Sequence, residues 1–339
     1  MNLLGLTYHQ LVDEFRRRYG RGAFHAAALY RAFYQSAHPV LDDLPAFAAS
    51  PRLLRQVGHD LDSSRPTVVR RTVDNGVTKL VFELADGLEI ETVVIPMANH
   101  ATVCISSQVG CRMGCRFCRT GAMGLRRNLT AAEIVAQVYT VRVHMGIALR
   151  NVVFMGMGEP LDNLDQVAHA IEIMEDQRGL DIAKRHMTLS TVGLADAIAA
   201  LGGLNWRRLR LAISLNASND TIRDRLMPIN TRYPMQMLKA ALRQYPLDKG
   251  GTVFVEYVLI RGVNDRMQHA RELAHYLADL PVKLNLIAYN PGRHASFQAP
   301  TPQGFNRFHR ALVDLHLFVR VRSAKGARIR AACGQLGGS

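Results

Sequence analysis

The sequence predicts an α/β fold, in which a helical segment and a β-hairpin precede a parallel sheet or barrel. Three observations support this. Residues 1 to about 65 show helical periodicity, Asp86-Gly87 gives a strong hairpin-turn signal, and strand-like runs alternate with amphipathic helical runs after residue 130. Such alternation is typical of parallel sheets, because a crossover between parallel strands needs a helix.

The first part of the chain is predicted to form a helical accessory domain over residues 1–65. Its apolar residues recur at helical spacing through Leu11, Phe15, Ala27, Leu29 and Phe33. Residues 66–96 then read as strands, with VTKLVFEL and LEIETVVIP on either side of the Asp86-Gly87 turn. We therefore expect a β-hairpin to connect the helices to the core.

The core is predicted to span residues 97–326, followed by a tail over 327–339. Thr130 and Glu133 form a capping box that opens a helix. The strands expected after it are NVVFMGMGEP, HMTLSTVG, RLRLAISLNAS, TVFVEYVLIRG and KLNLIAYNP, and the helices between them include 164–175, 220–226, 236–244 and 266–278. Active sites in such folds lie at the carboxyl ends of the strands. The polar and glycine residues found there are Gly158, Glu159, Ser190, Ser214, Asn216 and Asn290.

Composition narrows the function classes. Hydrophobic residues make up 48% and charged residues 21%, which fits a globular protein. The formal net charge of +14 favours a polyanionic partner, although an Arg-rich solvated surface is the alternative. No run approaches the about 18 apolar residues of a membrane span, and the start lacks signal-peptide features. We expect a cytoplasmic protein with no membrane partner, and a monomer.

Cysteine spacing indicates a metal cluster. Cys111, Cys115 and Cys118 put three thiols on one short loop, where they can ligate three corners of a cubane iron-sulfur cluster. Without a fourth cysteine nearby, one iron stays open to an exogenous ligand. The alternative is zinc bound by these cysteines and a histidine such as His100. The spacing, with Phe117 before the last cysteine, resembles the radical S-adenosylmethionine signature.

Several ordered blocks resemble the RlmN/Cfr family of RNA adenine methyltransferases, from about residue 67 to the end. They are CISSQVGCRMGCRFCRTGAMGLRRNLT, FMGMGEP, LSTVG, ISLNAS, MPIN, LIAYNP and AACGQL. The resemblance implies a partial (β/α)6 radical SAM barrel, one 4Fe-4S cluster held by the three cysteines, and two S-adenosyl-L-methionine molecules per turnover. It also implies methylation of an adenine ring carbon in structured RNA, ribosomal or transfer, and a low-potential electron donor such as flavodoxin or ferredoxin.

The resemblance also assigns roles to single residues. Cys333 matches the S-methylcysteine intermediate, and Cys104 matches the resolving thiol that forms a transient disulfide with it. Glu91 matches the proton acceptor, and Glu89 is its nearest competitor on the strand. Taken alone, Cys333 reads as a buried core residue and Glu91 as an exposed strand carboxylate. The residues that match cofactor contacts are Gly158, Glu159, Ser190, Ser214, Leu215, Asn216 and Asn290, of which Asn216 stands where well-known members have histidine.

Basic residues surround the predicted site and suggest RNA phosphate contacts or neutralisation of an anionic cluster. They are Arg112, Arg116, Arg119, Arg126, Arg127, Arg320, Arg322, Lys325, Arg328 and Arg330. Arg328 and Arg330 replace residues that are acidic in the family, and we expect them to favour ionisation of Cys333. TGAMGLRRNLT and MPINTRYP lean toward the branch that methylates carbon 8. We favour carbon 2, with carbon 8, another RNA, a non-RNA substrate and a zinc RNA-binding protein left as alternatives.

Overall fold

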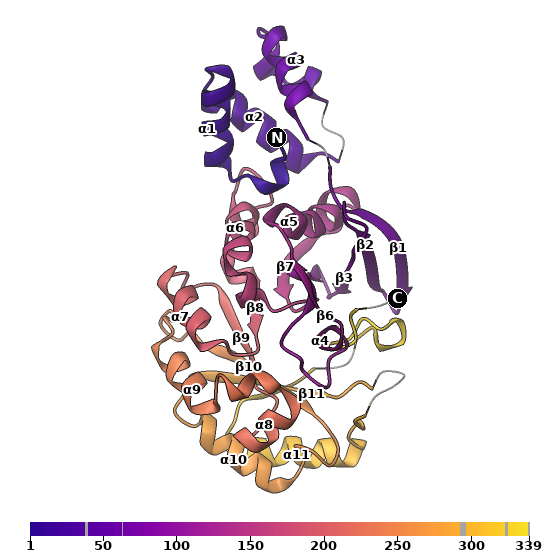
Figure 1. Ribbon diagram of the computed structural model, residues 1–339, viewed down its shortest axis with the longest axis vertical. Coiled ribbons are helices and arrows are strands. Elements are labelled where there is room, and N and C mark those ends of the chain that lie inside the picture. Colours follow the sequence, from indigo (N-terminus) through magenta and orange to yellow (C-terminus); the bar gives the residue numbers. More distant parts are fainter. Residues whose placement is uncertain (38–39, 63, 292–295, 323–324, 338–339) are drawn as a thin grey trace.

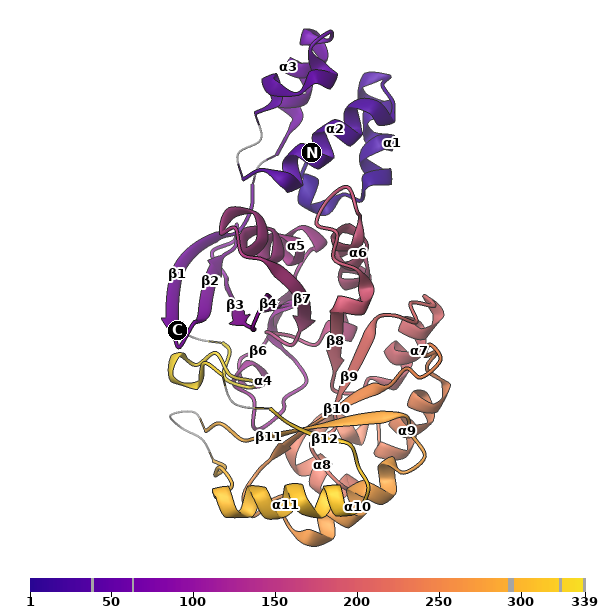
Figure 2. The same cartoon turned by 180° about the vertical axis from the view of Figure 1, so that it is seen from behind.

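A computed structural model describes residues 1–37, 40–62, 64–291, 296–322 and 325–337. Along its longest axis, the amino-terminal helices lie at one end, the sheet lies in the middle, and a layer of helices closes the other end (Figure 1). The last described residues lie next to the first hairpin in both ribbon views, so the two ends of the core meet (Figures 1 and 2). Residues 338 and 339 of the predicted tail lie outside the described residues.

The helical amino-terminal part contains α1 (Tyr8–Tyr19), α2 (Ala23–Gln35) and α3 (Pro51–Asp60). Thr7 and Gln10 form a capping box at the start of α1, and Gly20 ends this helix at φ 60°. The ring of Phe33 stacks on Tyr139 of the core, with the ring centroids 4.9 Å apart. The Tyr139 hydroxyl donates to the carbonyl of Phe33 at 3.0 Å, which fixes α2 against the core.

Three antiparallel strands follow: β1 (Thr67–Asp74), β2 (Val77–Glu83) and β3 (Glu89–Pro96). The predicted hairpin around Asp86-Gly87 is confirmed, with Gly87 at φ 77°, where a side chain would be strained. β3 pairs antiparallel with β4 (Ala101–Cys104), so that Val93 lies opposite Cys104. The hairpin is therefore part of the main sheet.

From β4 onward the main sheet is parallel. Its further strands are β7 (Leu149–Phe154), β8 (Met187–Thr191), β9 (Arg210–Ser214), β10 (Val253–Leu259), β11 (Val282–Ala288) and β12 (Val319–Arg322). The sheet order is β1-β2-β3-β4-β7-β8-β9-β10-β11-β12. The predicted α/β fold with a helical part and antiparallel strands before a parallel sheet is confirmed. β12 is a short further strand, and as the last in the order it leaves the barrel partial.

Helices cover the outer face of the parallel strands. They are α5 (Ala131–Tyr139), α6 (Leu164–Glu175), α7 (Ala195–Gly203), α8 (Asp220–Leu226), α9 (Met235–Gln244), α10 (Met267–Leu277) and α11 (Pro302–Asp314). Figure 2 shows α9, α10 and α11 on the outer side of β10 and β11. The predicted capping box of Thr130 and Glu133 opens α5. No helix among the described residues is long and apolar enough to cross a bilayer.

Candidate active site

One cavity lies at the carboxyl ends of the parallel strands, with about 1070 Å³ of empty space including the part open to solvent. It gathers residues from nearly the whole core. The predicted site residues that line it are Cys111, Cys115, Cys118, Gly158, Glu159, Ser190, Ser214, Asn216, Asn290 and Cys333. Leu215, Glu91 and Cys104 are not part of its lining. Most predicted strand-end residues therefore meet at one place.

The cysteine loop is framed by a small second sheet, which the sequence did not predict. Its strands β5 (Gln108–Cys111) and β6 (Gly124–Asn128) pair antiparallel, and the short helix α4 (Arg119–Ala122) lies between them. Gly110 has φ 76°, and a Cβ there would lie 1.8 Å from the carbonyl oxygen of Gly124. Only glycine fits, because the two strands approach so closely.

The three loop cysteines have the environment of cluster ligands. Cys111 and Cys115 are buried and Cys118 is partly buried. The amides of Thr120 and Gly121 donate to the Cys118 sulfur, as expected for a thiolate acceptor. Burial raises the pKa of the Cys111 thiol to about 12, so these thiols need a bound cation to ionise.

The position of His100 does not support the alternative of a zinc site. His100 does not line the cavity, and its Nε2 lies 3.1 Å from the side-chain nitrogen of Asn151. Among the described residues, no three His, Cys, Asp or Glu side chains are grouped to hold a single metal ion. A cubane differs from a single ion because its thiolates sit at separate iron atoms.

Glu159 is a buried carboxylate in the wall of the cavity, 2% exposed. Its Oε2 accepts from the amide of Val192 at 2.9 Å, and its Oε1 accepts from the amide of Leu161 at 3.2 Å. Burial raises the pKa of Glu159 to about 7, while hydrogen bonds from Thr191 and Val192 oppose the rise. A cationic group of a ligand would stabilise the ionised form.

Gly158 needs to be glycine because it packs closely against other residues of the protein, not because a ligand approaches it. Its φ is 104°, and a Cβ would lie 2.7 Å from Cβ of Gln108 and 2.8 Å from Oγ of Ser107. The GMGEP segment therefore packs directly against the residues that lead into the cysteine loop. Gln108 also accepts from the amide of Glu159 through its Oε1 at 2.8 Å. The close packing fixes Glu159 relative to Cys111.

The end of β9 is held by a buried arginine that sequence reasoning missed. Arg223 on α8 is fully buried and donates to the carbonyls of Leu215, Tyr233 and Val192 and to Oδ1 of Asn230. Asn230 belongs to the MPIN block, so this block helps to hold the Arg223 side chain in place. Arg223 thus ties the strand-end segments after β8 and β9 together.

Asn216 has a structural role besides lining the cavity. It adopts φ 57°, which asparagine tolerates better than most residues. Its Oδ1 accepts from the amide of Val258 at 2.9 Å, and its carbonyl accepts from Asn264 at 2.9 Å. Asn216 therefore bridges the end of β9 and β10.

The carboxyl-terminal tail is fastened to the cysteine loop. The amide of Arg119 donates to the carbonyl of Gly334 at 2.9 Å, and the Thr120 hydroxyl donates to the carbonyl of Leu336 at 2.6 Å. Cys333 lies on this tail, is exposed, and lines the cavity. A cysteine far along the chain is thereby brought to the predicted cluster loop.

Cys104 ends β4 beside the cavity and is buried. Burial, and then the charge of Cys333, raise the pKa of the Cys104 thiol to about 12, and Arg322 opposes the rise. The charge of Arg322 also acts on Cys333. Arg322 is thus a further cation whose charge acts on both thiols. The expected influence of Arg328 and Arg330 on Cys333 stays a prediction.

Glu91 is buried on β3, 3% exposed, and not an exposed strand carboxylate. Its Oε1 lies 3.3 Å from Nζ of Lys79, a partner that sequence reasoning did not identify. Its Oε2 accepts from the amide of Gly337 at 3.2 Å. The tail therefore occupies Glu91 in this conformation, and access to it requires the tail to move.

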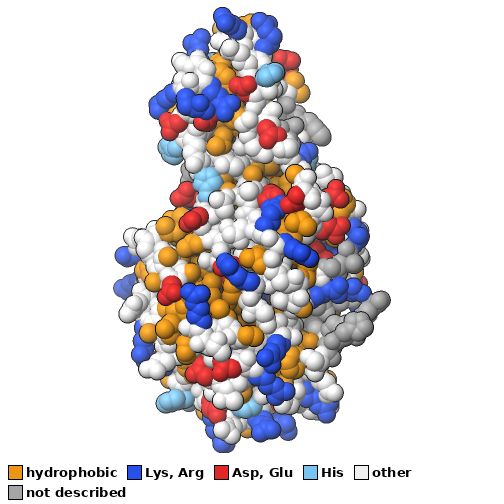
Figure 3. All heavy atoms as spheres, viewed as in Figure 1, with side chains coloured by type: hydrophobic (Ala, Val, Ile, Leu, Met, Phe, Trp, Pro, Cys, Tyr) orange, Lys and Arg blue, Asp and Glu red, His pale blue; other side chains and the backbone are white. Residues whose placement is uncertain are grey.

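Some of the predicted basic residues form ion pairs within the protein, and others do not. Arg112 is paired with Asp162, Arg127 with Asp86 and Glu133, and Arg322 with Glu256. These cations have structural partners. Those without an ion pair among the described residues are Arg116, Arg119, Arg126, Arg320, Lys325, Arg328 and Arg330. Lys and Arg side chains are scattered over the face shown in Figure 3, so charge alone does not mark one site on that face.

Comparisons with known proteins agree with this geometry. A family model described as the radical SAM superfamily matches residues 105–274. The dual-specificity RNA methyltransferase RlmN of Geobacter sulfurreducens is 41% identical over 344 aligned residues, which cover 100% of this chain and 92% of the relative. The chain belongs to the RlmN family. The RlmN of Geotalea uraniireducens is 43% identical, covering 94% of this chain and 92% of the relative.

A solved structure supports the RlmN assignment at the level of the whole fold. The crystal structure of a radical SAM methyltransferase from Sphaerobacter thermophilus superposes with a TM-score of 0.91 at 38% identity, over 99% of each chain. The protein is thus a radical SAM RNA methyltransferase, as the sequence blocks predicted. Membership of the radical SAM superfamily implies a 4Fe-4S cluster and S-adenosylmethionine.

Proposed function

We propose that this RlmN-family protein methylates carbon 2 of an adenine in ribosomal and transfer RNA. The observation that carries the proposal is the cavity shared by the three loop cysteines, the strand-end polar residues and Cys333. A radical enzyme with only a cofactor site would not need a thiol on a tail fastened to the cluster loop. The family name of the relatives, dual-specificity RNA methyltransferase, supports two classes of RNA.

The residues present fit the implied cofactors. Cys111, Cys115 and Cys118 would hold one 4Fe-4S cluster, because their thiols share one wall and Cys118 already accepts two amide hydrogens. The residues that would hold S-adenosylmethionine are Gly158, Glu159, Ser190, Ser214, Leu215, Asn216 and Asn290. When bound, the two groups supply the methyl group and the radical chemistry.

Glu159 would accept from the ammonium of the cofactor, since its carboxylate is buried and faces the cavity. Its two backbone donors hold the carboxylate in place. Leu215 would contribute through its main chain, because Arg223 fixes its carbonyl.

Cys333 would carry the methyl group as S-methylcysteine, and its exposure leaves the sulfur accessible to a base. Cys104 would later attack the Cys333 sulfur while that sulfur is still joined to the base through the transferred carbon. The S–S bond forms as the S–C bond breaks, and the carbon leaves on the RNA with the bonding electron pair and takes up a proton to become the methyl group. The charges of Cys333 and Cys104 both act on Arg322, so a guanidinium is available to stabilise either thiolate. Arg322 therefore lies near both sulfurs.

Glu91 would accept the proton from the adenine carbon. The Lys79 ammonium lies 3.3 Å from one carboxylate oxygen of Glu91 and holds the side chain in place. The hydrogen bond from Gly337 to Glu91 links this step to the position of the tail. When the tail moves with RNA bound, the carboxylate becomes free to act.

The proposal also covers the electron donor, the cellular location, the oligomeric state and the domain organisation of the protein. A low-potential flavodoxin or ferredoxin would supply electrons, and the protein would act as a cytoplasmic monomer. The helices of residues 1–65 would form the accessory domain, residues 66–96 the hairpin connection, 97–326 the barrel and 327–339 the tail.

The experiment that tests the function uses anaerobically reconstituted protein, S-adenosylmethionine, a chemical reductant, and ribosomal or transfer RNA from a strain that lacks the gene. The RNA is digested and its nucleosides are separated by mass spectrometry against standards. We expect 2-methyladenosine in both RNA classes. Formation of 8-methyladenosine, or no methylated adenosine in either RNA, would contradict the proposal.

A further inference from the structure

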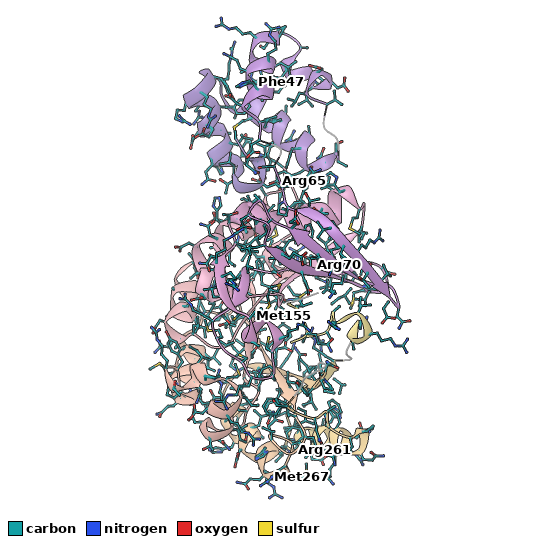
Figure 4. The ribbon with its side chains drawn as sticks, turned by 45° about the vertical axis from the view of Figure 1, so that its right-hand side comes forward. Phe47, Arg65, Arg70, Met155, Arg261 and Met267 are labelled. Carbon is teal, nitrogen blue, oxygen red and sulfur yellow. The ribbon has the colours of Figure 1, made fainter. Side chains whose placement is uncertain are left out.

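A second cavity lies inside the barrel, at the amino ends of the strands. Its lining consists of Val153, Met155, Thr188, Arg210, Phe254, Glu256, Asn285, Arg320, Val321 and Arg322. Met155, Glu256 and Arg322 also line the active-site cavity. Met155 lies in the middle of the molecule, among the strands (Figure 4). The two cavities therefore adjoin through a shared wall inside the barrel.

Strand alternation explains which residues face this second cavity. Side chains two apart on a strand share a face, so Arg320 points the same way as Arg322, and Arg210 the same way as Ser214. Ser214 and Arg322 both line the active-site cavity. Arg210 and Arg320 thus occupy inward positions one layer closer to the amino ends. Barrels usually fill such positions with branched apolar residues, so two arginines here are unusual.

The two arginines carry charge that no described carboxylate neutralises. Both side chains are exposed, and neither forms an ion pair among the described residues. Partial desolvation of the guanidinium, and then the charges of Arg320 and Arg150, lower the pKa of Arg210. The nearest acid in the lining, Glu256, is already bonded to Arg322 at 3.1 Å and to Asn285 at 2.7 Å. Mutual repulsion would be relieved by an anion.

An aromatic side chain lies beside these cations. Phe318 precedes β12 and is 55% exposed. The guanidinium of Arg320 and the ammonium of Lys283 each lie 5.7 Å from the centre of its ring. An exposed ring flanked by cations is typical of surfaces that stack bases and bind phosphates of RNA.

We propose that RNA binds at the amino ends of the barrel strands, where Arg210 and Arg320 contact the phosphates on either side of a flipped-out base. The base enters through the second cavity and reaches Cys333 past the Glu256–Arg322 pair. This inference rests on the proposed RNA methyltransferase function and adds the direction from which the base arrives. In this proposal the Glu256–Arg322 pair lies between the RNA and the two thiols, so the base has to pass it to reach Cys333.

The competing surface lies on the tail side of the site. A third cavity there is lined by Arg116, Arg119, Arg328 and Arg330. Arg119 is already committed to carbonyls of the tail, which close this side against the cysteine loop. A base that came in there would meet the tail at Gly334, whereas a base that passes between Arg210 and Arg320 would meet the Glu256–Arg322 pair. The unpaired charges of Arg210 and Arg320, beside the exposed ring of Phe318, favour the amino-end route.

The test measures binding of a fluorescent RNA stem-loop to reconstituted full-length protein as a function of salt. The double variant Arg210→Gln/Arg320→Gln is compared with Arg307→Gln/Arg310→Gln, two exposed arginines on α11 that serve as a matched control. A third variant, Arg328→Gln/Arg330→Gln, represents the competing surface. Methylation of Cys333 in the absence of RNA reports that each variant is folded and loaded.

We expect the Arg210/Arg320 variant to lower the slope of log affinity against log salt by about two, roughly one for each phosphate that no longer faces a guanidinium. Its RNA-independent methylation of Cys333 should equal that of the wild type, and the α11 control should change neither quantity. An unchanged slope in this variant, or a slope that falls only in the Arg328/Arg330 variant, would overturn the proposed route. Failure of the wild type to bind RNA would instead contradict the proposed function.

Discussion

The two ends of the barrel differ in how completely their polar groups are bonded. At the carboxyl ends, Glu159, Asn216 and Arg223 are buried and bonded to several partners each. At the amino ends, Arg210 and Arg320 are exposed and lack a described carboxylate partner. The bonded end is rigid and suits small cofactors of fixed shape. The unpaired positive charge at the amino ends suits a polyanion, whose phosphates can pair with the two arginines.

This difference predicts large, salt-independent losses for changes at the carboxyl ends and moderate, salt-dependent losses at the amino ends. The reason is that buried groups interact in a low local dielectric, whereas exposed charges are screened. At the carboxyl ends, we expect the effects of substitution to decrease from the thiols through Glu159 to Arg223.

Replacement of Cys333 by alanine should abolish RNA methylation, because no other described cysteine that lines the cavity is exposed. The measurement is incorporation of labelled methyl into RNA. Iron content and cofactor binding should stay at the wild-type level, because Cys333 belongs to the tail and not to the cysteine loop. Residual methylation above a small percentage of wild type would contradict a relay through this sulfur.

Replacement of Cys115 by serine should remove the iron-sulfur cluster, since a serine hydroxyl is a poor substitute for a buried thiolate. Iron and sulfide analysis and the visible absorption of the reconstituted protein measure the loss. Cys104→Ser is the matched control, because Cys104 is equally buried but lies outside the loop. It should retain the cluster and accumulate a covalent protein-RNA adduct during turnover. Loss of iron from both variants would point to a general folding defect.

Replacement of Glu159 by glutamine should weaken S-adenosylmethionine binding by about ten- to a hundredfold, the range expected when a charge-assisted hydrogen bond of about 1.5–3 kcal/mol is removed. Equilibrium dialysis with labelled cofactor measures the effect. Asp162→Asn is a useful comparison, because this carboxylate pairs with Arg112 instead of lining the cavity. Equal affinity in wild type and Glu159→Gln would show that the ammonium binds elsewhere.

Replacement of Arg223 by methionine should lower the free energy of unfolding by about 2–4 kcal/mol, because several buried carbonyls lose their donor. Denaturant titration of the protein without cofactors gives the value. The exposed Arg225 on the same helix provides the control, and its replacement by methionine should change stability by less than about 0.5 kcal/mol. A stable Arg223 variant would remove the role assigned to the MPIN block.

The sequence predicted the features that depend on neighbouring residues. The Asp86-Gly87 hairpin, the Thr130–Glu133 capping box and the strand-helix alternation all follow from local preferences, and the structure contains each of them. The cysteine loop was recognisable because its three thiols are close in the chain.

Ion pairs and hydrogen bonds between residues that are far apart in the chain could not be predicted from local sequence. Nothing near Arg112 or Arg127 indicates that Asp162 and Asp86 neutralise them, so both looked available for RNA. Lys79 beside Glu91 and Arg223 behind β9 were missed because ordinary surface residues have the same local sequence. Arg210 and Arg320 become a pair only when β9 and β12 close around one cavity.

The most direct test of the account follows the methyl group on Cys333. Reconstituted protein is incubated anaerobically with labelled S-adenosylmethionine and reductant, freed of cofactor, and then supplied with RNA and unlabelled cofactor. Peptide mass spectrometry before RNA addition should find the label on Cys333, and nucleoside analysis afterwards should find it on adenine. Unlabelled Cys333, or RNA that receives only the unlabelled methyl in its first turnover, would contradict the relay.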